Sequence, residues 1–519
     1  MQHNFNTIII GGGHNGLTCA AYLARAGHSV LVLEAASQIG GAARSRTIAE
    51  GSQVFPAAHL LHSMPEKIVN ELQLEQNGLR FAAKHIKTVS LNSNGAVIVI
   101  ANNQAAGDQL TAGDIEGYGR FYRDMQRFSK ALVPVFDKVA PELAIESWRQ
   151  KLDLLGFGWT IRKLGKFHMR EFLRIIGMNL YDLMDEYIEN PQLKAAIAMD
   201  ALLGSEWGAR SMGSVLTYLY RQAGELRNQT GIALPCGGMG AVSLAIAQSA
   251  QQSGAEIRCN SAVKNIIIDS GKAVGVELET GERILAETIV SNADPKHTFL
   301  TLVNPDHLGT NFVRQVNNLR SKGKAGKLHL ALSQQPEFKG LDNSLLGERL
   351  VIAPSMDDIE LAFNPSKYRR YPEAPIMEII LPSVSDDSLC QNGQQLLSAV
   401  VQYLPYDDSV DEDENRADML KVLIGQLEQY APGISELIIA AELLTPRDIE
   451  REFGISGGHW HHVELVFESF MFNRPTPLLT RHATPIGSLF LCGAGCHPGG
   501  NVMGIAGRNA AQQVLRGGK

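Results

Sequence analysis

The sequence contains no long apolar run, since no stretch approaches the roughly 18 uninterrupted apolar residues that a membrane-spanning helix needs. It also has little excess charge: 47 basic and 54 acidic residues leave a formal net charge of −7, which does not suggest nucleic acid as a partner. The first apolar strand starts almost at once, leaving no room for a signal or transit peptide. We therefore expect a folded cytoplasmic protein without a nucleic-acid partner.

Cysteine is scarce, and its six positions are scattered. No CxxC or CxxxxC pair follows the N-terminal glycine turn, where the redox-active pair of a disulfide reductase would lie, and a second nicotinamide-binding βαβ unit is missing as well. We therefore predict neither disulfide chemistry nor NAD(P)H binding. Cys492 and Cys496 flank a glycine turn with CxxxC spacing, which is consistent with two separate thiols or with a redox or metal pair.

The first forty residues have the pattern of a dinucleotide-binding βαβ unit: apolar run, glycine turn, small-residue helix, apolar run and acid. Gly11 lets the chain turn sharply, Gly13 lets a pyrophosphate approach the backbone, and Gly16 lets the helix lie close on the sheet. The helix N-terminus favours phosphate, and Glu34 can accept hydrogen bonds from ribose hydroxyls. The candidate cofactor-binding residues here are Gly11, Gly13, His14, Asn15, Gly16 and Glu34.

A second glycine pair narrows the choice of cofactor. Gly40 and Gly41 follow Glu34 by six residues, and Arg44 comes three positions after the pair. The loop must pass close beneath an extended dinucleotide, and the Arg44 guanidinium can pair with pyrophosphate. This arrangement resembles the glutathione-reductase-like flavoprotein fingerprint, and it therefore favours FAD over a nicotinamide cofactor.

Two later segments fit the same site. Residues 235–295 contain a glycine turn, a helix and a strand–hairpin–strand pattern; Val263 would place its backbone at the adenine, and Asn292 follows the last strand. Residues 488–511 contain a strand, a glycine-rich loop and a small-faced helix, which we expect to begin near Val502 with Asn501 as its N-cap. The candidate flavin-binding residues of this loop are Gly493, Gly495, Gly500, Asn501 and Val502.

The rest of the chain divides into a sheet-like part and a helical part. Residues 86–100 alternate apolar and polar around Asn94-Gly95, which predicts a hairpin, and residues 114–230 are mostly helical by pattern. Within that block, residues 149–174 carry seven basic and two acidic side chains interleaved with aromatic and aliphatic ones. Such a segment either docks on an anionic membrane surface or forms a helical lid packed on the protein.

Taken together, the motifs resemble those of the phytoene-dehydrogenase-related flavoproteins, closest to the branch of pyridine nucleotide-disulfide oxidoreductase domain-containing protein 2. The segments that carry the resemblance span essentially the whole chain, at residues 11–17, 40–43, 237–241, 457–459, 491–500 and 506–510. The resemblance implies an α/β fold: a glutathione-reductase-like (Rossmann-type) FAD-binding domain with a mixed-sheet substrate domain and a helical insertion. We assign residues 1–85, 235–295 and 476–519 to the FAD-binding domain, and residues 86–234 and 296–475 to the substrate domain.

The resemblance also implies an FAD-dependent oxidoreductase or desaturase that acts on a hydrophobic, isoprenoid- or lipid-like substrate by hydride transfer to flavin N5. It brings His459, His461 and His497 to the site as candidate catalytic residues, because a neutral imidazole can take up a proton near pH 7. A metal site at the histidines of residues 459–462 and a purely structural lining are the alternatives; we predict no metal. One departure from many FAD proteins is that the last glycine loop lacks an acidic residue.

Two other functions remain open. An amine-oxidase-like flavoenzyme would have an aromatic cage beside the flavin and would release peroxide. A flavin-bound binding or scaffolding protein would show little turnover. The sequence indicates neither the oligomeric state nor the electron acceptor.

Overall fold

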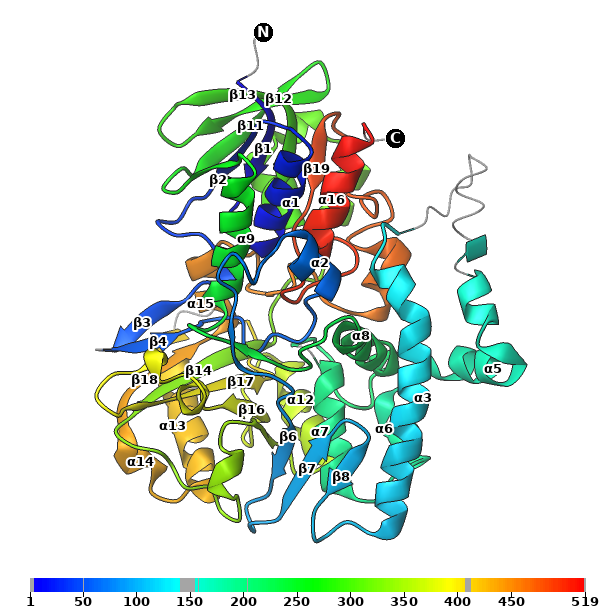
Figure 1. The fold of residues 1–519 in the computed structure, drawn as a ribbon, viewed down its shortest axis with the longest axis vertical. Coiled ribbons are helices and arrows are strands. Elements are labelled where there is room, and N and C mark those ends of the chain that lie inside the picture. Colours follow the sequence, from blue (N-terminus) through cyan, green and yellow to red (C-terminus); the bar gives the residue numbers. More distant parts are fainter. Residues whose placement is uncertain are drawn as a thin grey trace.

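The computed structural model describes residues 4–49, 51–140, 155–156, 158–202, 204–406 and 412–517. Two β-sheets organise it, one in the upper and one in the lower half of Figure 1. The upper sheet combines strands from the two ends and the middle of the chain, whereas the lower sheet combines the segment after residue 85 with the segment after residue 320. This arrangement confirms the predicted α/β fold.

The upper sheet contains seven strands among the described residues, in the order β10-β2-β1-β13-β12-β11, with β19 paired to β13. Their bounds are β1 Phe5–Ile10, β2 Val30–Leu33, β10 Glu256–Arg258, β11 Val263–Asp269, β12 Lys272–Leu278, β13 Arg283–Ser291 and β19 Leu489–Leu491. The strands β10, β2, β1, β13 and β19 pair in parallel, and β11 to β13 form an antiparallel meander. All four residues of β2 are buried, as expected for a strand covered on both faces.

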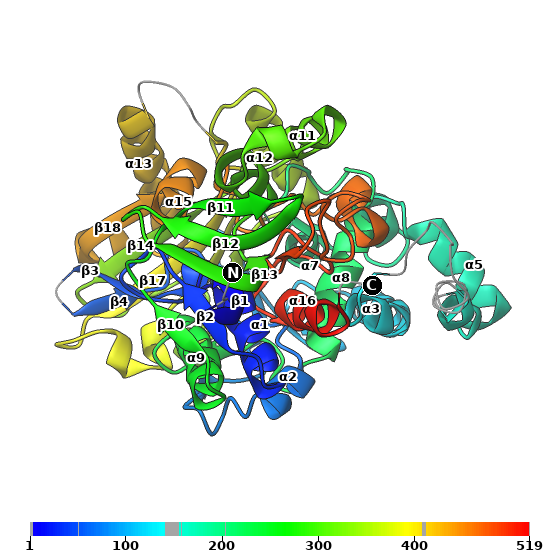
Figure 2. The same cartoon turned by 90° about the horizontal axis from the view of Figure 1, so that it is seen from above.

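Three helices cover one face of this sheet: α1 (His14–Arg25), α9 (Gly240–Gln252) and α16 (Ile505–Leu515). In Figure 2, α1 lies between the other two. The close approach of α1 and α16 depends on a glycine, because a Cβ on Gly507 would lie 2.0 Å from the Asn15 carbonyl oxygen. The glycine-rich ends of the chain therefore meet side by side.

The lower sheet has the order β18-β14-β17-β16-β15-β6-β7-β8. Its strands are β6 Thr88–Leu91, β7 Val97–Ala101, β8 Gln104–Ala106, β14 Ala325–Leu332, β15 Arg349–Ile352, β16 Met377–Ile380, β17 Gln395–Gln402 and β18 Ile438–Leu444. The predicted hairpin around Asn94-Gly95 joins β6 and β7. Leu423 and Leu427 of α13 (Glu412–Tyr430) belong to the core on one face of this sheet, so its other face is left for the junction with the upper half.

The predicted helical insertion lies beside the lower sheet. It comprises α3 Ala112–Phe136, α5 Gly165–Ile175, α6 Leu180–Asp185, α7 Pro191–Leu202 and α8 Ser214–Leu226. The start of α3 is fixed by a capping box between Thr111 and Asp114. Helix α5 projects from the body of the molecule (Figure 1), and no helix among the described residues is long and apolar enough to cross a membrane.

Shorter elements connect these layers. Their bounds are α2 Glu66–Glu71, α10 Pro295–His297, α11 Thr310–Asn317, α12 Met356–Ser366, α14 Ile434–Leu437, α15 Pro446–Phe453, β3 Arg46–Ala49, β4 Ser52–Val54, β5 Phe81–Ala83 and β9 Leu234–Pro235. Strands β3 and β4 pair with each other, and β5 pairs with β9.

One boundary differs from the predicted domain segments. Phe299, Leu302, Phe312 and Val316 pack in one core with residues of the upper sheet such as Ile8. The part of the chain that we placed in the substrate domain from residue 296 therefore stays on the nucleotide-binding side until about residue 320. The sequence pattern did not reveal this because short apolar helices look alike in either domain.

Candidate flavin and substrate site

The first glycine turn has the geometry of a dinucleotide loop. Gly11 has φ +96°, and a Cβ on Gly16 would lie 2.3 Å from the Gly11 carbonyl oxygen. Helix α1 then begins at His14 without a side-chain cap, so its first N–H groups remain available to phosphate. The Asn292 side chain lies against this turn, since a Cβ on Gly13 would be 2.7 Å from its Nδ2. The structure thus brings Asn292 next to the turn.

Glu34 directly follows β2, beside the same turn. One of its carboxylate oxygens accepts from the Gly12 amide at 2.7 Å and the other from the Ala36 amide at 2.8 Å. The Ser261 amide donates to the Glu34 carbonyl oxygen, which places the start of β11, with Val263, near the acid. These contacts hold the carboxylate at the edge of the turn, where ribose hydroxyls would lie.

The second glycine pair packs directly on the first turn. The Gly40 amide donates to the Gly12 carbonyl oxygen at 2.9 Å, and a Cβ on Gly41 would lie 3.2 Å from the Gly13 Cα. Arg44, however, is already engaged: its Nη2 pairs with Glu452 Oε1 at 3.3 Å, while its Nε has no hydrogen-bond partner. A pyrophosphate contact of Arg44 therefore remains a prediction.

The C-terminal glycine loop closes the site from the other side. A Cβ on Gly493 would lie 2.7 Å from the Asn292 carbonyl oxygen, and one on Gly500 would lie 1.8 Å from His461 Nδ1. A Cβ on Gly495 would lie 2.9 Å from the Pro295 side chain. These three positions leave room for backbone only, so the loop can pass close to a flat ligand.

One local prediction at this loop was wrong. Helix α16 begins at Ile505 with Gly504 as its N-cap, not near Val502 with Asn501 as the cap. Asn501 has φ +82°, whereas a capping side chain needs an extended backbone. Its Nδ2 is buried without a hydrogen-bond partner, and both Asn501 and Val502 line the cavity described next. They are thus available to a ligand rather than used by the helix.

The residues fit FAD in the positions that the structure gives them. An uncapped helix N-terminus, an acid at the edge of the turn and two glycine turns packed on each other form the cradle, in which a side chain on Gly16 would collide with Gly11 and one on Gly500 with His461. The orphaned amide of Asn501 and the Nε2 of His14, which also has no partner, lie where the isoalloxazine end would be held. The cradle therefore matches an extended flavin dinucleotide.

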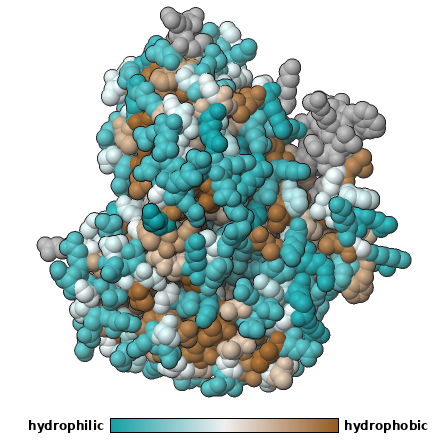
Figure 3. Space-filling view, viewed as in Figure 1, coloured by the Kyte–Doolittle hydropathy of each residue, from teal (hydrophilic) through white to brown (hydrophobic). Residues whose placement is uncertain are grey.

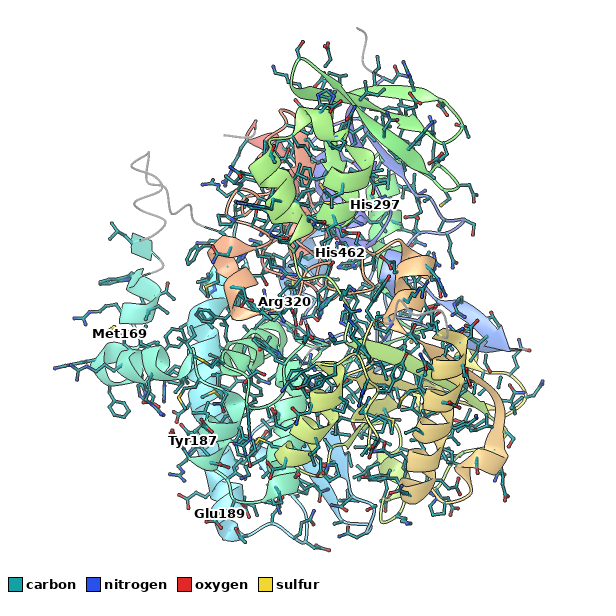
Figure 4. The ribbon with its side chains drawn as sticks, turned by 180° about the vertical axis from the view of Figure 1, so that it is seen from behind. Met169, Tyr187, Glu189, His297, Arg320 and His462 are labelled. Carbon is teal, nitrogen blue, oxygen red and sulfur yellow. The ribbon has the colours of Figure 1, made fainter. Side chains whose placement is uncertain are left out.

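A cavity opens next to this cradle, between the two halves of the molecule. In Figure 4, His462 lies at the junction of the halves, with Arg320 on the side of the lower one. Small and aliphatic side chains form much of the cavity wall. They are Ala42, Ala43, Ala57, Ala58, Leu60, Met199, Val400, Ala494 and Val502.

The opposite wall is charged and comes from the lower sheet. In β14, Leu328 and Leu330 enter the core on one face, so Lys327 and His329 point to the other. The sheet register places Lys327 opposite Val400, and Val400 opposite Glu378. Lys327 and Glu378 therefore share the face that turns towards the cradle.

An ion-pair network lies over this face. Arg349 Nη2 is 2.6 Å from Glu378 Oε2 and 2.9 Å from Asp200 Oδ1, and Arg221 Nε is 3.6 Å from Asp200. Burial raises the pKa of Asp200 to about 7 against the opposing effect of Arg349. At Glu378, burial is outweighed chiefly by Arg349, which lowers the pKa of that carboxyl to about 2.

His59 is the link between this network and the cavity. Its Nδ1 lies 2.5 Å from Lys327 Nζ, and its Nε2 lies 3.7 Å from Glu378 Oε1. Burial, and then the neighbouring Lys327, lower the pKa of His59 well below its usual value, so the ring is neutral. Burial likewise lowers the pKa of Lys327 well below its usual value, although the Glu378 carboxylate acts to raise it.

The predicted catalytic histidines have different places. His461 lines the cavity. His459 is buried behind it, with its Nδ1 accepting from the His461 amide at 3.3 Å. His497 lies away from the cavity, with its Nε2 3.0 Å from the Val135 carbonyl oxygen of α3. The geometry thus gives His497 a packing position, so of the three only His461 reaches the cavity.

Arg474 holds the loop that carries His461. Its side chain is fully buried, and its Nη atoms donate to the carbonyl oxygens of His461, Val463, Glu464 and Ala494. Burial lowers the pKa of this guanidinium to about 10, which leaves it charged at neutral pH. One side chain therefore ties the histidine segment to the C-terminal glycine loop.

The sequence analysis missed the charged wall. Asp200 and Arg221 come from α7 and α8, Arg349 and Glu378 from β15 and β16, and His59 from the loop after β4. The one available signal was the pair of ionisable residues in the otherwise apolar strand β14. As for metals, no group of three or more His, Cys, Asp or Glu side chains in the described parts of the chain is arranged to hold an ion.

Comparisons with known proteins agree with this geometry. Residues 16–515 match the family described as flavin containing amine oxidoreductase. The chain is 30% identical to pyridine nucleotide-disulfide oxidoreductase domain-containing protein 2 of Rattus norvegicus, over 99% of this chain and 94% of the relative. It is 26% identical to the lycopene-forming phytoene desaturase of Pantoea ananas, over 98% of each.

Among solved structures, a putrescine oxidase double mutant superimposes with a TM-score of 0.61 at 13% identity, over 99% of this chain and 98% of that one. This likeness concerns the fold. The family match covers almost the entire chain, from the last glycine of the first turn to the end of α16. The chain therefore belongs to the flavin-containing amine oxidoreductase family and is an FAD-dependent oxidoreductase.

Proposed function

We propose that this FAD-dependent oxidoreductase dehydrogenates a hydrophobic, isoprenoid- or lipid-like substrate. The observation that carries the proposal is the cavity wall of alanine, leucine, methionine and valine side chains directly beside the flavin cradle. An apolar substrate body gains free energy by leaving water for such a wall. The relative named phytoene desaturase supports a desaturation reaction.

When bound, FAD accepts a hydride equivalent from a substrate carbon at N5. The chain itself binds and orients the two partners. The turns at Gly11–Gly16 and Gly40–Gly41 would hold the dinucleotide, and the loop at residues 493–502 would close over the flavin. The neighbouring carbon loses a proton in the same reaction, and His461 on the cavity wall would take up that proton.

The test is anaerobic reduction of the purified yellow holoprotein by a cell lipid extract. We expect loss of the oxidised flavin absorbance and the appearance in the extract of a lipid lighter by one pair of hydrogens. A holoprotein that stays oxidised with every lipid fraction contradicts the proposal. If the purified protein carries no flavin and takes up no FAD, the result contradicts its assignment as an FAD-dependent oxidoreductase.

A second candidate function is oxidation of amines. Trp460 lines the cavity, and Asp200 and Glu378 lie on its charged wall, which favours a cationic substrate. Against this, both carboxylates are paired with the Arg349 guanidinium, so little free negative charge faces the cavity. Release of peroxide in air on addition of an amine pool, without reduction by lipids, would establish the amine reaction instead.

We also propose that helix α5 contacts an anionic membrane surface. Trp159, Phe167 and Leu173 are 63%, 75% and 61% exposed, and the basic residues Lys163 and Lys166 lie among them. Figure 3 shows hydrophobic and hydrophilic residues side by side on this projecting segment, and exposed apolar rings next to cations suit a lipid headgroup layer. A membrane contact at this position would give a lipid substrate a route to the protein. The predicted segment extends back to residue 149, and residues 149–154 and 157 lie outside the described ones.

A further inference from the structure

The charged wall of the cavity contains donor groups that nothing in the described structure satisfies. His59 Nε2 and Arg221 Nη1 are both buried and have no hydrogen-bond partner. Both residues line the cavity beside the flavin cradle. A buried donor without a partner costs about 1–3 kcal/mol, so a pair of such donors on one cavity wall calls for a ligand.

The neighbour of His59 determines which ring nitrogen carries the proton. The Lys327 amine has N–H groups in either protonation state, and it lies 2.5 Å from Nδ1. A neutral amine can also accept, but the Glu378 carboxylate near Nε2 favours a proton on that nitrogen, so we assign Nδ1 as the acceptor and Nε2 as the N–H group of the neutral ring. The nearest carboxylate oxygen, Glu378 Oε1, is 3.7 Å away, beyond hydrogen-bond range. The Nε2–H group is thus a fixed, unused donor on the cavity wall.

Arg221 is similarly held in place. Its guanidinium lies 3.6 Å from Asp200 and 3.4 Å from Glu225 through Nε and Nη2, which leaves Nη1 unpaired. The residue is only 3% exposed, so solvent does not satisfy it. Arg221 comes from α8 and His59 from the loop after β4, and the two donors are therefore supplied by separate, well-packed elements.

We infer that the substrate is not a pure hydrocarbon but carries an sp² oxygen, as a carbonyl or carboxyl group, that accepts hydrogen bonds from His59 Nε2 and Arg221 Nη1. The inference rests on the proposed function and narrows its substrate class to amphiphilic molecules. The alanine-rich wall binds the apolar body, and the charged wall binds the oxygen. Because the cavity opens beside the flavin cradle, the oxygen fixes which carbons of the chain meet the flavin.

The experiment is an equilibrium titration of the oxidised holoprotein, in which binding is measured as a change in the flavin absorbance. The probes are farnesene, farnesol, farnesal and farnesoic acid, which share a carbon skeleton, and the linear series hexadecane, hexadecanol, hexadecanal and palmitic acid. We expect the aldehyde or the acid to bind about tenfold or more tightly than the hydrocarbon of the same series. Comparing the affinity of the aldehyde with that of the acid shows whether the site prefers a carbonyl or a carboxyl group.

Variants test which residues cause the preference for oxygen-bearing probes. His59→Phe should remove most of the preference for oxygen while keeping hydrocarbon binding, and His59→Asn, which retains a donor, should restore part of it. Arg221→Met tests the second donor if His59→Phe does not yield folded protein. His62→Phe is the matched control: His62 also lines the cavity, but it is only half-buried and neither of its ring nitrogens is a buried atom without a hydrogen-bond partner, so the preference should persist.

Equal binding of hydrocarbon and oxygenated probes, or a preference that survives both His59→Phe and Arg221→Met, overturns the inference. Reduction of the flavin by hydrocarbon fractions of a lipid extract alone also overturns it and leaves the proposed function standing. If neither the extract nor any probe acts on the flavin, the proposed function fails, and the inference fails with it.

Discussion

Lys327 Nζ lies 2.5 Å from His59 Nδ1, although 268 positions separate the two residues. Both are buried on the face of the lower sheet that turns towards the flavin cradle. A lysine amine in such a place is costly, and here it is compensated by the imidazole and by Glu378. The pair connects the lower sheet to the loop that lines the cavity.

Replacing Lys327 with Met tests this connection. The stability should change little, because a costly buried amine gives way to an apolar side chain of similar length while His59 Nδ1 loses its hydrogen-bond partner. Flavin reduction by the substrate should slow by roughly tenfold, because the His59 ring loses the partner that fixes its tautomer. Urea unfolding and anaerobic stopped-flow absorbance measure the two effects. A variant that unfolds, or one that reacts at the wild-type rate, would contradict this role.

The C-terminal glycine loop provides a test of the cradle. Gly500→Ala should weaken FAD binding by roughly tenfold or more and destabilise the protein by about 1–3 kcal/mol, because the new Cβ would lie 1.8 Å from His461 Nδ1. Flavin content after dialysis and thermal unfolding report the change. The control is Gly425→Ala, an exposed position in α13 with no atom near the added Cβ. It should be stabilising by about 1 kcal/mol without loss of flavin.

Arg474 should be essential to the histidine segment. Arg474→Met removes donors from several buried carbonyl oxygens, including those of His461 and Ala494, and we expect a loss of about 3–5 kcal/mol in the free energy of unfolding. Arg474→Lys keeps the charge but not the fork of donors, so it should recover only part of the loss. Full stability of the Met variant would show that the carbonyl oxygens find other donors.

Stability should depend on pH through the buried histidines. Burial is the main cause that lowers their pKa from 6.5 to about 4 at His14, His462, His482 and His497, and to about 3 at His459. The unfolded chain therefore binds more protons than the folded one below pH 6.5, and stability should fall as the pH drops from about 6.5 towards 4. The raised pKa of Asp200 acts in the opposite direction but involves a single group.

The contribution of a single buried histidine to this pH dependence can be measured separately. His482→Asn should reduce the slope of unfolding free energy against pH by up to about 1.4 kcal/mol per unit in that range. Urea melts at several pH values measure it, and Gly425→Ala should shift stability without changing the slope. An unchanged slope in the His482 variant would show that this ring does not contribute to the acid sensitivity.

The proposed membrane contact is tested by reversing charge on α5 and the turn before it. The triple change Lys163→Glu, Lys166→Glu and Arg170→Glu should weaken binding to vesicles rich in phosphatidylserine by roughly a hundredfold, at about 1 kcal/mol for each cation lost. Reversal of three lysines exposed elsewhere, Lys84, Lys264 and Lys339, is the control and should have little effect. Equal binding of both triple variants and the wild type would rule the contact out.

The flavin cradle was predictable because its signals are local. Gly11, Gly16, Gly40 and Glu34 occur at spacings that a βαβ unit requires whatever the remaining chain does. The same holds for the hairpin between β6 and β7. In these segments the backbone conformation restricts the residue type, so the sequence carries the structure directly.

The charged wall could not be predicted in this way. Its members come from separate helices, strands and a loop, and each looks like an ordinary surface charge until the lower sheet brings it inside. Only the alternation in β14, with Lys327 and His329 between leucines, indicates a polar face on a buried strand. Likewise, Asn501 resembled a helix cap, but its left-handed backbone excludes that role. Long-range packing decided each of these positions.

The most direct test of the central claim is an anaerobic comparison of lipids and amines as reductants of the same yellow holoprotein. The account predicts that an oxygen-bearing lipid bleaches the flavin and is recovered with one new carbon–carbon double bond, whereas amines leave the flavin oxidised. Bleaching by amines alone, or by no lipid fraction at all, would contradict it.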